Sequence, residues 1–397
     1  MTGLFHSHVS TILVTCPRGM ASCLKDEMVR LGFPVKSEHA TGVETEGTLI
    51  DTMRVNLMVR TGHRVLFLLN DFSALTPDDL YRGVTAMPWE DYLMRDGFFS
   101  VVSSVQNQYI RDTRFANLRC KDAIVDRFMK KYGSRPDTGS SKQGAVVFLY
   151  WHDNRCSLYL DTSGEPLSRR GYRTVPLAAP LQETLAAAVI MSTRWNGSDV
   201  FINPMCGSGT LAIEAASMAA GIAPGLTRKH FGFMHLKGFD ASAWRDLTTR
   251  AKKIVTVPVQ GTVIASDISR DAIEASRNNA ARAGVDRFIE FHRCDFRETP
   301  VPGGPGVVVL NPEYGERMGH EDSLKTLYGE IGDFFKHRCR GMWGYVFTGN
   351  RDLAKKIGLR TARKILFMNG PIECRLLEYD LYQGSRKQLK STGGYDK

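Results

Sequence analysis

The stretch "DVFINPMCGSGTLAIEAASMAAG", residues 199–221, decides the fold that we predict. A short apolar strand ends at Asn203, small residues form a loop at 206–209, and a helix is predicted over 210–220. Glycines let a backbone bend sharply and approach a ligand, and the first turn of a helix offers free N–H groups. The pattern favours a nucleotide-type site at the first strand of a doubly wound sheet. The alternative is an ordinary strand-to-helix turn with glycines for packing.

The loop matches neither G-x-x-x-x-G-K-[ST] nor G-x-G-x-x-G, which argues against phosphate cleavage and weakens a dinucleotide reading. From residue 162 onward, apolar strands alternate with helical segments, which is typical of a parallel sheet covered on both faces. We place the strands near 199–203, 262–266, 288–292, 306–310 and 343–347.

Acidic residues directly follow two of these strands. Asp267 comes after 262–266, where a carboxylate is placed to accept hydrogen bonds from both hydroxyls of a ribose. Asp295 follows the next strand and would accept from the exocyclic amine of adenine, with Phe296 beside the ring. A helix-capping acid at Asp267 and a solvated turn at Asp295 are the alternatives.

The stretch "GVVVLNPEYGERMG", residues 306–319, ends a buried strand with an amide, a proline and an aromatic ring. The lone pair of an exocyclic amine is delocalised into its ring, so acceptors for both N–H bonds favour the nucleophilic geometry. The Asn311 side-chain oxygen and the Pro312 carbonyl are such acceptors, and Tyr314 would stack on the base. An Asn-Pro turn is the alternative, but polar residues at successive strand ends together favour methyl transfer to a base.

Composition and charge bound the other functions. The chain has 397 residues with a net charge of +10, which indicates a polyanionic partner such as nucleic acid. The eight cysteines form no C-x-x-C or zinc pattern, so we expect reduced thiols in a cytoplasmic protein and no metal. No apolar run of about 18 residues and no secretory signal appear, so no membrane partner is expected.

A basic amphipathic helix is predicted over 112–133. Its expected buried face carries Phe115, Leu118, Ala123, Ile124 and Phe128. Arg and Lys side chains decorate the segment, and we expect them to hold an RNA backbone, with a solvated surface as the alternative. The candidates are Arg111, Arg114, Arg119, Lys121, Lys130 and Lys131.

The order of these motifs resembles class I S-adenosylmethionine-dependent methyltransferases. In detail the chain resembles THUMP-domain RNA methyltransferases that make N2-methylguanosine, close to the bacterial 23S rRNA (guanine-N2) methyltransferases. The stretches that carry this resemblance are "TCPRGM", "DTRFANLRCKDAIVDRF", "DTSGEPLSRRGYRTVPLAAPLQETLAAAVI", "NPMCGSGTLAIEAA" and "NPEYGERMG". Asn203 stands where many relatives have Asp, and Glu313 replaces the usual second proline of N-P-P-Y.

The resemblance implies an α/β chain with a Rossmann-like methyltransferase domain, whose sheet is mostly parallel and seven-stranded, after an α+β ferredoxin-like and THUMP RNA-binding region. The expected boundaries are 1–60 for the ferredoxin-like unit, 61–162 for THUMP, 163–384 for the methyltransferase domain and 385–397 for a basic tail. S-adenosylmethionine is the implied cofactor. Its expected contacts are Asn203, Pro204, Cys206, Gly207, Ser208, Gly209, Thr210, Asp267, Ile268, Asp295, Phe296, Asn311 and Thr184.

The resemblance also implies that a linker packs over the cofactor, through Arg170, Gly171, Tyr172, Arg173, Pro180, Leu181 and Thr184. From the residues alone, "SRRGYR" is a basic loop that would bind phosphate through Arg170 and Arg173 or form a surface. Arg317 would contact RNA phosphate or pair with an acid.

The predicted reaction is direct methyl transfer to the N2 amine of a guanosine in structured RNA, most readily 23S rRNA, with Asn311, Pro312 and Tyr314 as catalytic residues. A tRNA substrate or the N6 amine of adenine is the alternative within this class. An inactive RNA-binding or assembly factor is the alternative of a different class, supported only by Glu313. A monomer is favoured.

Overall fold

The structure is a computed structural model that describes residues 4–108, 110, 112–173, 181–254, 262–314 and 321–382. Contacts divide the chain into two compact units. The N-terminal unit comprises Met1–Gly171 and Ile222–Val255, and the C-terminal unit comprises Tyr172–Gly221 and Thr256–Lys397. The segment Ile222–Val255 belongs to the N-terminal unit, although in sequence it lies inside the predicted methyltransferase domain. The domain boundaries taken from the sequence stay predictions.

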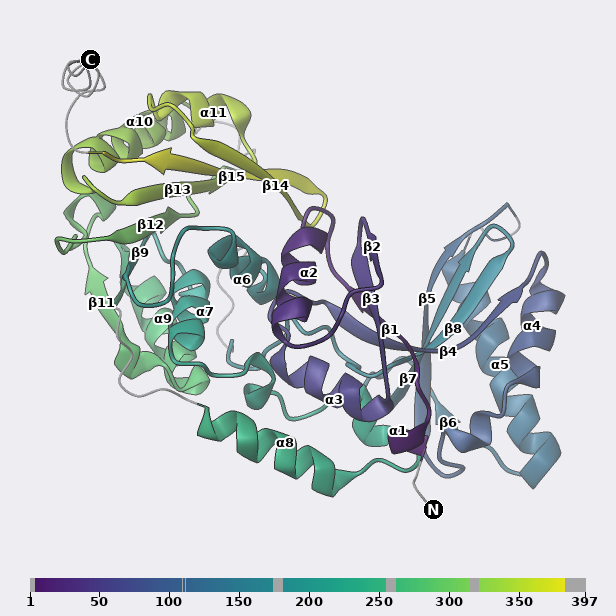
Figure 1. Ribbon diagram of the computed structural model, residues 1–397. Coiled ribbons are helices and arrows are strands. Elements are labelled where there is room, and N and C mark those ends of the chain that lie inside the picture. The colour runs from purple at the N-terminus through teal and green to yellow at the C-terminus, as the bar shows by residue number, and fades with distance from the viewer. Residues whose placement is uncertain are drawn as a thin grey trace, which may run out of the picture. The chain divides into compact units, whose positions relative to one another are not determined.

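The N-terminal unit is built on one eight-stranded sheet with the order β2-β3-β1-β4-β8-β7-β5-β6 (Figure 1). Strand β4 pairs antiparallel with β1 on one side and with β8 on the other. The regions predicted as ferredoxin-like and THUMP therefore share a continuous sheet. The strands are β1 (Ser10–Thr15), β2 (Ser37–His39), β3 (Gly42–Gly47), β4 (Arg64–Ser73), β5 (Phe98–Gln106), β6 (Asp137–Thr138), β7 (Ala145–His152) and β8 (Arg155–Asp161).

Two helices of this unit begin at capping motifs that are visible in the sequence. Helix α3 begins at a capping box between Thr48 and Asp51, and α4 begins at a second one between Thr76 and Asp79. The helices of the unit are α1 (Leu4–Ser7), α2 (Ala21–Arg30), α3 (Leu49–Met58), α4 (Pro77–Ala86), α5 (Thr113–Tyr132) and α8 (Ala241–Lys253), with short 3₁₀ turns η1 (Trp89–Asp91), η2 (Pro224–Thr227) and η3 (Gly232–His235).

The predicted basic helix is α5, but its buried face was predicted partly wrong. Phe115 and Leu118 are 49% and 55% exposed, whereas Ala116 and Cys120 are buried in the first half of the helix. The second half buries Ala123, Ile124 and Phe128 as expected. The cause is that α5 packs against both β5 and α4, and this places its buried stripe on Ala116 and Cys120 and not on the two large apolar side chains.

The C-terminal unit contains a seven-stranded sheet with the order β11-β10-β9-β12-β13-β15-β14 (Figure 1). Strands β11, β10, β9, β12 and β13 are parallel, and β15 pairs antiparallel with both β13 and β14. The predicted mostly parallel sheet is therefore confirmed. The strands are β9 (Val200–Pro204), β10 (Val263–Asp267), β11 (Ile289–Arg293), β12 (Gly306–Leu310), β13 (Trp343–Thr348), β14 (Arg363–Asn369) and β15 (Ile372–Asp380).

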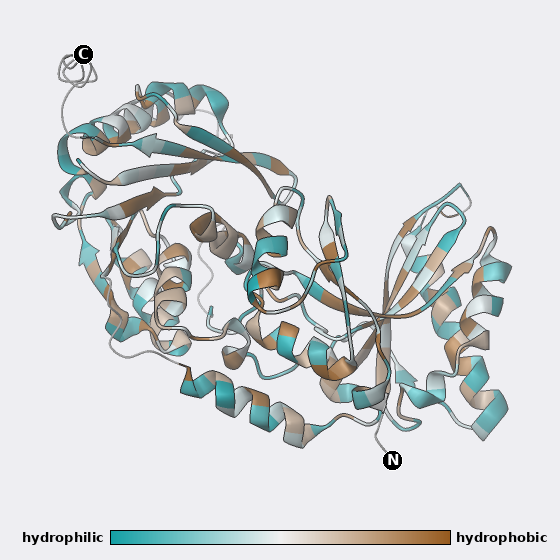
Figure 2. Cartoon of the chain, in the orientation of Figure 1, coloured by the Kyte–Doolittle hydropathy of each residue, from teal (hydrophilic) through white to brown (hydrophobic). Residues whose placement is uncertain are grey.

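Burial explains why these central strands read as apolar runs. All five residues of β12 are buried, as are four of the five in β10, because a parallel sheet is covered on both faces. Helices α6 and α7 carry mostly apolar colours in Figure 2. The helices are α6 (Glu183–Met191), α7 (Thr210–Ala219), α9 (Arg270–Ala283), α10 (Glu321–Arg338) and α11 (Arg351–Lys356), with 3₁₀ turns η4 (Asp286–Phe288) and η5 (Phe296–Glu298).

Candidate functional site

The carboxyl ends of three neighbouring strands form the centre of the candidate site. Strand β9 pairs with β10 on one side and β12 on the other, and all three run in the same direction. Their ends therefore meet at one edge of the sheet, and the chain leaves β9 where the strand order reverses. An open α/β sheet offers a ligand crevice at such a point. Asn203, Asp267 and Asn311 lie at these three strand ends.

The loop after β9 depends on backbone conformations that favour glycine. Gly207 and Gly209 have φ angles of 55° and 81°. A Cβ atom at Gly209 would also lie 2.4 Å from the Ser276 Oγ atom of α9. Glycine is thus required at Gly209 both by its conformation and by the close approach of α9, which brings the first turn of α7 to the sheet edge.

The Asp267 carboxylate is fixed beside this loop. Its Oδ2 atom accepts a hydrogen bond from the Gly207 N–H at 2.9 Å, and its Oδ1 atom accepts from the Ser269 N–H at 2.9 Å. A carboxylate offers about four acceptor positions, so two are left for ligand hydroxyls. The next residue, Ile268, is 68% exposed, which leaves an apolar side chain open beside the acid.

Cys206 is a buried, neutral thiol within the same loop. Its Sγ atom contacts the Ser276 Oγ atom at 3.6 Å. Burial raises the pKa of Cys206 to about 12. The thiolate needed for nucleophilic attack is therefore scarce at neutral pH.

The stretch from Asn311 to Tyr314 follows β12 directly. The Oδ1 atom of Asn311 is buried and has no hydrogen-bond partner among the residues that the structure describes. Pro312 is buried, Glu313 is exposed and Tyr314 is half-buried. An unpaired buried acceptor is costly, because it has lost its water without gaining another partner. Asn311 thus offers an acceptor that a bound N–H group would satisfy.

Two predicted cofactor residues have protein partners of their own. The Asp295 carboxylate accepts hydrogen bonds from the Arg297 Nε and Nη2 atoms, each at 2.8 Å. Phe296 is buried and packs edge-on against Phe334, with the ring centroids 5.8 Å apart. An amine bound at Asp295 would share the carboxylate with Arg297, and the Phe296 ring belongs to the hydrophobic core.

The linker before α6 reaches the glycine loop through Arg173. The Arg173 Nη2 atom donates to the Thr210 Oγ1 atom at 2.9 Å and to the Leu181 carbonyl at 2.7 Å, and it pairs with Glu183 at 3.3 Å. Thr184 is fully buried, and no described residue hydrogen-bonds its Oγ1 atom. Arg173 was predicted to contact RNA, but these bonds instead give it a structural role beside the loop.

Arg170 does not fit its predicted RNA contact. Its side chain is 2% exposed, and its guanidinium donates to the carbonyls of Leu167 and Arg60. A buried arginine that is committed to backbone carbonyls cannot reach a phosphate without breaking those bonds. Sequence alone does not distinguish such an arginine from an exposed one, since both lie in a basic loop.

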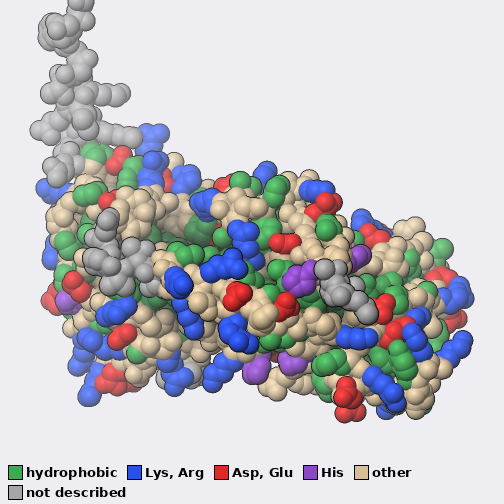
Figure 3. Space-filling view, turned by 60° about the horizontal axis from the view of Figure 1, so that its bottom comes forward, with side chains coloured by type: hydrophobic (Ala, Val, Ile, Leu, Met, Phe, Trp, Pro, Cys, Tyr) green, Lys and Arg blue, Asp and Glu red, His purple; other side chains and the backbone are tan. Residues whose placement is uncertain are grey.

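The remaining RNA candidates lie on or near α5. Arg114 and Lys121 pair with neighbouring acids, and Arg119 pairs with Asp78 while its guanidinium lies 4.3 Å from the centre of the Tyr81 ring. On the face seen in Figure 3, Lys and Arg side chains are spread widely with acidic side chains between them. Three predicted site residues, Arg111, Pro180 and Arg317, lie outside the described residues.

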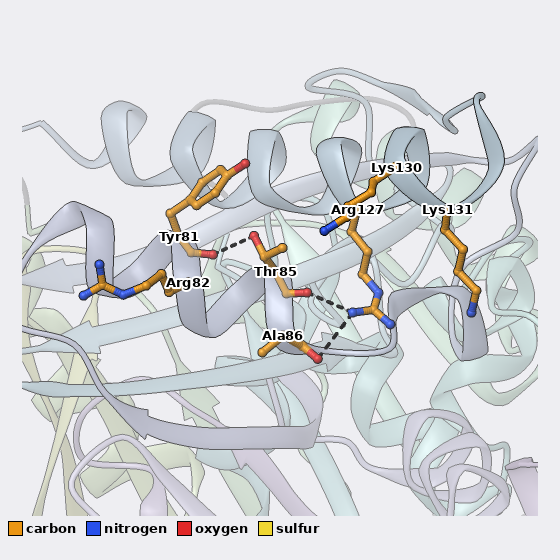
Figure 4. A pocket seen from close by; sticks show the side chains of 7 residues that line it. All are labelled: Tyr81, Arg82, Thr85, Ala86, Arg127, Lys130 and Lys131. Carbon is orange, nitrogen blue, oxygen red and sulfur yellow. Dashed lines mark hydrogen bonds between the residues drawn. The ribbon is translucent and has the colours of Figure 1, made fainter.

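A basic pocket of about 630 Å³ lies between α4 and α5 (Figure 4). Arg127 reaches across it and donates to the carbonyls of Thr85 and Ala86. Glu90 accepts from Arg127 and from Lys131, and the bonds from Arg127 hold the pKa of the Glu90 carboxyl well below its usual range. The residues lining the pocket are Tyr81, Arg82, Thr85, Ala86, Arg127, Lys130 and Lys131.

Lys130 differs from the other cations of this pocket, because no described acidic side chain pairs with it. It is exposed and has no acidic partner within the described part of the chain, whereas Arg82 pairs with Asp79 and Lys131 with Glu90. Arg127 lies with Lys130 and Lys131 on the predicted basic helix but was not among the predicted RNA-binding residues, and Glu90 was missed. A buried acid that pairs with cations from another helix leaves no mark in the sequence pattern.

The described residues contain neither a candidate metal cluster nor a candidate membrane span. No group of three or more His, Cys, Asp or Glu side chains there is placed to hold a metal ion. No helix there is both long and apolar enough to cross a membrane.

The sheet order and the strand-end residues define a class I methyltransferase fold, and family comparisons agree. Residues 170–378 match the UPF0020 family, described as an RMKL-like methyltransferase domain. Residues 11–66 match the RlmL ferredoxin-like domain, and residues 74–161 match the THUMP domain. The chain belongs to the UPF0020 methyltransferase family and carries a THUMP domain, so the resemblance seen in the sequence is confirmed.

The chain is similar to several named proteins. It is 39% identical over 377 residues to "Ribosomal RNA large subunit methyltransferase K/L" of Syntrophotalea carbinolica, which covers 92% of this chain and 53% of the relative. It is 33% identical to "Putative RNA methyltransferase slr0064" of Synechocystis sp., over 96% of this chain and 99% of the relative. The chain thus spans about half the length of the K/L relatives but nearly all of slr0064.

Solved structures resemble the whole chain as well. The structure of SMU.472, named as a methyltransferase complexed with SAH, has a TM-score of 0.85 at 25% identity and covers 95% of this chain and 99% of its own. A protein from Listeria monocytogenes, named as a predicted N6-adenine-specific DNA methylase, has a TM-score of 0.85 at 30% identity, with 94% and 96% coverage. The family match and the SAH complex of a similar structure confirm the prediction of S-adenosylmethionine as the cofactor.

Proposed function

We propose that this chain transfers a methyl group from S-adenosylmethionine to an exocyclic base amine in large-subunit ribosomal RNA, and that the amine is N2 of a guanosine. The observation that carries the proposal is the Oδ1 atom of Asn311, which is buried and has no partner among the described residues, at the sheet edge that also holds the glycine loop and Asp267. The match to large-subunit rRNA methyltransferases supports the class of substrate.

The residues at the sheet edge suit an adenosine-containing cofactor. The glycine loop and the start of α7 would lie against the amino-acid part, and Asp267 would accept from both ribose hydroxyls. Ile268 would cover the adenine, and Asp295 would accept from the adenine amine. We assign supporting contacts to Asn203, Pro204, Cys206, Ser208, Thr210 and Thr184. When bound, S-adenosylmethionine supplies an electrophilic methyl group on a sulfonium.

The chain's own groups would prepare the amine. The Asn311 Oδ1 atom and the Pro312 carbonyl would accept its two N–H bonds, which favours a pyramidal, nucleophilic nitrogen and stabilises the positive charge that develops on it. Tyr314 would stack on the base and align it. No covalent intermediate is required, and the raised pKa of Cys206 fits a thiol that takes no part.

RNA would be held by the N-terminal unit through backbone phosphates. Lys130 is exposed without an acidic partner in the described chain, and Arg114, Arg119, Lys121 and Lys131 lie along the same helix, α5. Lys and Arg contacts to phosphate position an RNA without reading its sequence. Because the amine of a paired guanine is shielded in a helix, the target base would be presented unpaired or flipped.

Adenine N6 is the second candidate amine. The N-P-x-Y pocket suits either base, and the Listeria monocytogenes protein that resembles this chain is named as a predicted N6-adenine-specific DNA methylase. The THUMP match favours RNA over DNA.

The test uses labelled S-adenosylmethionine, purified protein and ribosomal RNA from cells that lack this protein. We expect label in the large-subunit RNA, N2-methylguanosine by nucleoside mass spectrometry, and a fall in kcat of about 100-fold or more in Asn311→Ala with cofactor affinity little changed. Label in N6-methyladenosine would move the proposal to the second candidate. No transfer to any RNA, with cofactor binding intact, would instead indicate a binding module.

A further inference from the structure

The hydroxyl end of Tyr314 is held by the hairpin of β14 and β15. The Tyr314 hydroxyl oxygen accepts a hydrogen bond from the Asn369 Nδ2 atom at 2.9 Å and from the Cys374 Sγ atom at 3.5 Å. Asn369 is the last residue of β14, and Cys374 lies in β15. Neither residue belongs to the sequence motifs around the glycine loop or Asn311, so the contact is made only by the fold.

The turn of this hairpin places Asn369 at its tip. Asn369 pairs with Ile372 across the turn, and only two residues separate them. Gly370, the first of these, has a φ angle of 60°, which a glycine adopts without strain. A short turn of this kind fixes the register of the two strands, and with it the position of the Asn369 amide.

The ring of Tyr314 packs closely against backbone. A Cβ atom at Gly349 would lie 3.0 Å from the Tyr314 Cδ2 atom and 3.1 Å from its Cε2 atom. The same Cβ would lie 2.9 Å from the Cγ2 atom of Ile372, the residue that closes the hairpin turn. Gly349 therefore leaves just enough space for the ring between the end of β13 and the hairpin.

The backbone before Tyr314 is held as well. The Tyr328 hydroxyl contacts the Thr348 Oγ1 atom at 2.8 Å and donates to the Glu313 carbonyl at 3.4 Å. The Asn350 N–H in turn donates to the Thr348 Oγ1 atom at 3.1 Å. The aromatic end of the motif is thus anchored at its ring, its hydroxyl and its backbone, while the Asn311 Oδ1 atom has no partner in the described chain.

We propose that Asn369 is a positioning residue for the methyl transfer: through its hydrogen bond to the Tyr314 hydroxyl it holds in place the hydroxyl end of the ring on which the target base stacks. The inference rests on the proposed function, because it assumes that Tyr314 stacks on the base. A ring fixed before the base arrives loses no rotational freedom on binding. Burial also raises the pKa of Tyr314, so the hydroxyl stays neutral and the bond persists across the working pH range.

The experiment is a double-mutant cycle on the full chain with ribosomal RNA as substrate. Asn369→Leu removes the amide donor at similar volume, and Tyr314→Phe removes the hydroxyl but keeps the ring. Each single variant is expected to lower kcat about 10-fold, the change that follows from losing one hydrogen bond of about 1.4 kcal/mol. In the Tyr314→Phe background, Asn369→Leu should have almost no further effect, because the acceptor is already gone.

Three readouts separate positioning from a purely structural role. The dissociation constant for S-adenosylhomocysteine and the unfolding midpoint of Asn369→Leu should stay close to those of the wild type. Gly349→Ala, which crowds both the Tyr314 ring and Ile372 of the hairpin, should lower kcat too. Asn196→Ala is the matched control: its side chain accepts from the Ser198 and Asp199 N–H groups in the turn before β9, and its loss should leave kcat unchanged.

The outcomes are distinct. An unchanged kcat in Asn369→Leu, or an equal loss in the wild-type and Tyr314→Phe backgrounds, overturns the inference. A parallel loss of cofactor affinity overturns it as well, since a positioning residue for the base should spare the cofactor. If the wild type transfers no methyl group, or Asn311→Ala remains fully active, the proposed function fails instead.

Discussion

Single atoms at the sheet edge carry most of the chemistry that we propose. The Asp267 carboxylate is a clear case, because the Gly207 and Ser269 N–H groups orient it without any ligand. An acceptor that is already oriented need not be reorganised when a ribose binds, so little binding energy is lost to ordering.

Asp267→Ala is therefore expected to weaken binding of S-adenosylhomocysteine by about 10- to 100-fold, the loss of one or two hydrogen bonds to a charged acceptor. Isothermal titration calorimetry measures the change. Asp271→Ala removes an exposed carboxylate from the first turn of α9 and is the matched control. Equal affinity in wild type and Asp267→Ala would rule out a ribose contact.

The roles of individual arginines could not be predicted from the sequence. Arg170 and Arg173 read as a basic phosphate-binding loop in the sequence, yet the structure buries Arg170 and ties Arg173 to Thr210 and Glu183. An arginine side chain can bind phosphate at the surface or join buried segments by hydrogen bonds. Which of the two it does depends on the carbonyls and acids that the fold brings near it.

At the scale of elements, the pocket between α4 and α5 contains two kinds of cation: those paired with a carboxylate and one that is not. Arg127 and Lys131 share Glu90, while Lys130 is free of acidic partners in the described residues. A cation that already has a carboxylate partner gains less from a phosphate, because the two anions compete for it.

Lys130→Gln is expected to weaken RNA binding and to reduce the slope of log affinity against log salt by about one. Filter binding between about 50 and 200 mM salt measures the slope. Lys355→Gln on α11 removes another exposed lysine, one paired with Asp352, and should leave the slope unchanged. If Lys130→Gln also leaves the slope unaltered, Lys130 touches no phosphate.

Glu90→Gln tests how much the ion pairs of this pocket contribute to the free energy of unfolding. Loss of the carboxylate leaves Arg127 and Lys131 without their partner, and we expect the free energy of unfolding to fall by about 1–3 kcal/mol at pH 7. Because hydrogen bonds from Arg127 lower the folded-state pKa of Glu90, its stabilisation is complete above the unfolded pKa of about 4.3 and is lost as the pH falls below it.

The difference between wild type and Glu90→Gln should therefore shrink on acidification. Urea denaturation at pH 7 and at successively lower pH measures it. Glu165→Gln, which removes an exposed pair with Arg169, is the control and should cost only a few tenths of a kcal/mol. A difference that grows as the pH falls would contradict the ion-pair explanation.

At the scale of the whole molecule, the two units divide the proposed work. The C-terminal unit holds the glycine loop, Asp267 and Asn311, and the N-terminal unit holds the basic pocket of α4 and α5. The segment Ile222–Val255 lies in sequence between α7 and β10 but belongs to the N-terminal unit. Hydrogen bonds anchor it there: among them, the Arg60 Nη2 atom donates to the Ile222 carbonyl, and the Lys237 Nζ atom donates to the Glu90 carbonyl.

Cofactor binding should consequently stabilise the C-terminal unit. S-adenosylhomocysteine at about 100 times its Kd is expected to add about 2.7 kcal/mol to the free energy of opening. Hydrogen exchange followed by mass spectrometry should show slower exchange in peptides that contain β9 and β10. Asp267→Ala at the same ligand concentration should show less protection, and equal protection would contradict the proposed site.

Apolar patterning and motif spacing were enough to predict the fold class and the strand ends. Buried parallel strands read as apolar runs, and polar or small residues lie at their carboxyl ends, so Asn203, Asp267 and Asn311 could be placed from spacing alone. Three features become visible only in the folded chain: which arginines are buried, which face of α5 packs inward, and the hold of Asn369 on Tyr314. These depend on contacts between residues far apart in the chain, and local periodicity carries no information about them.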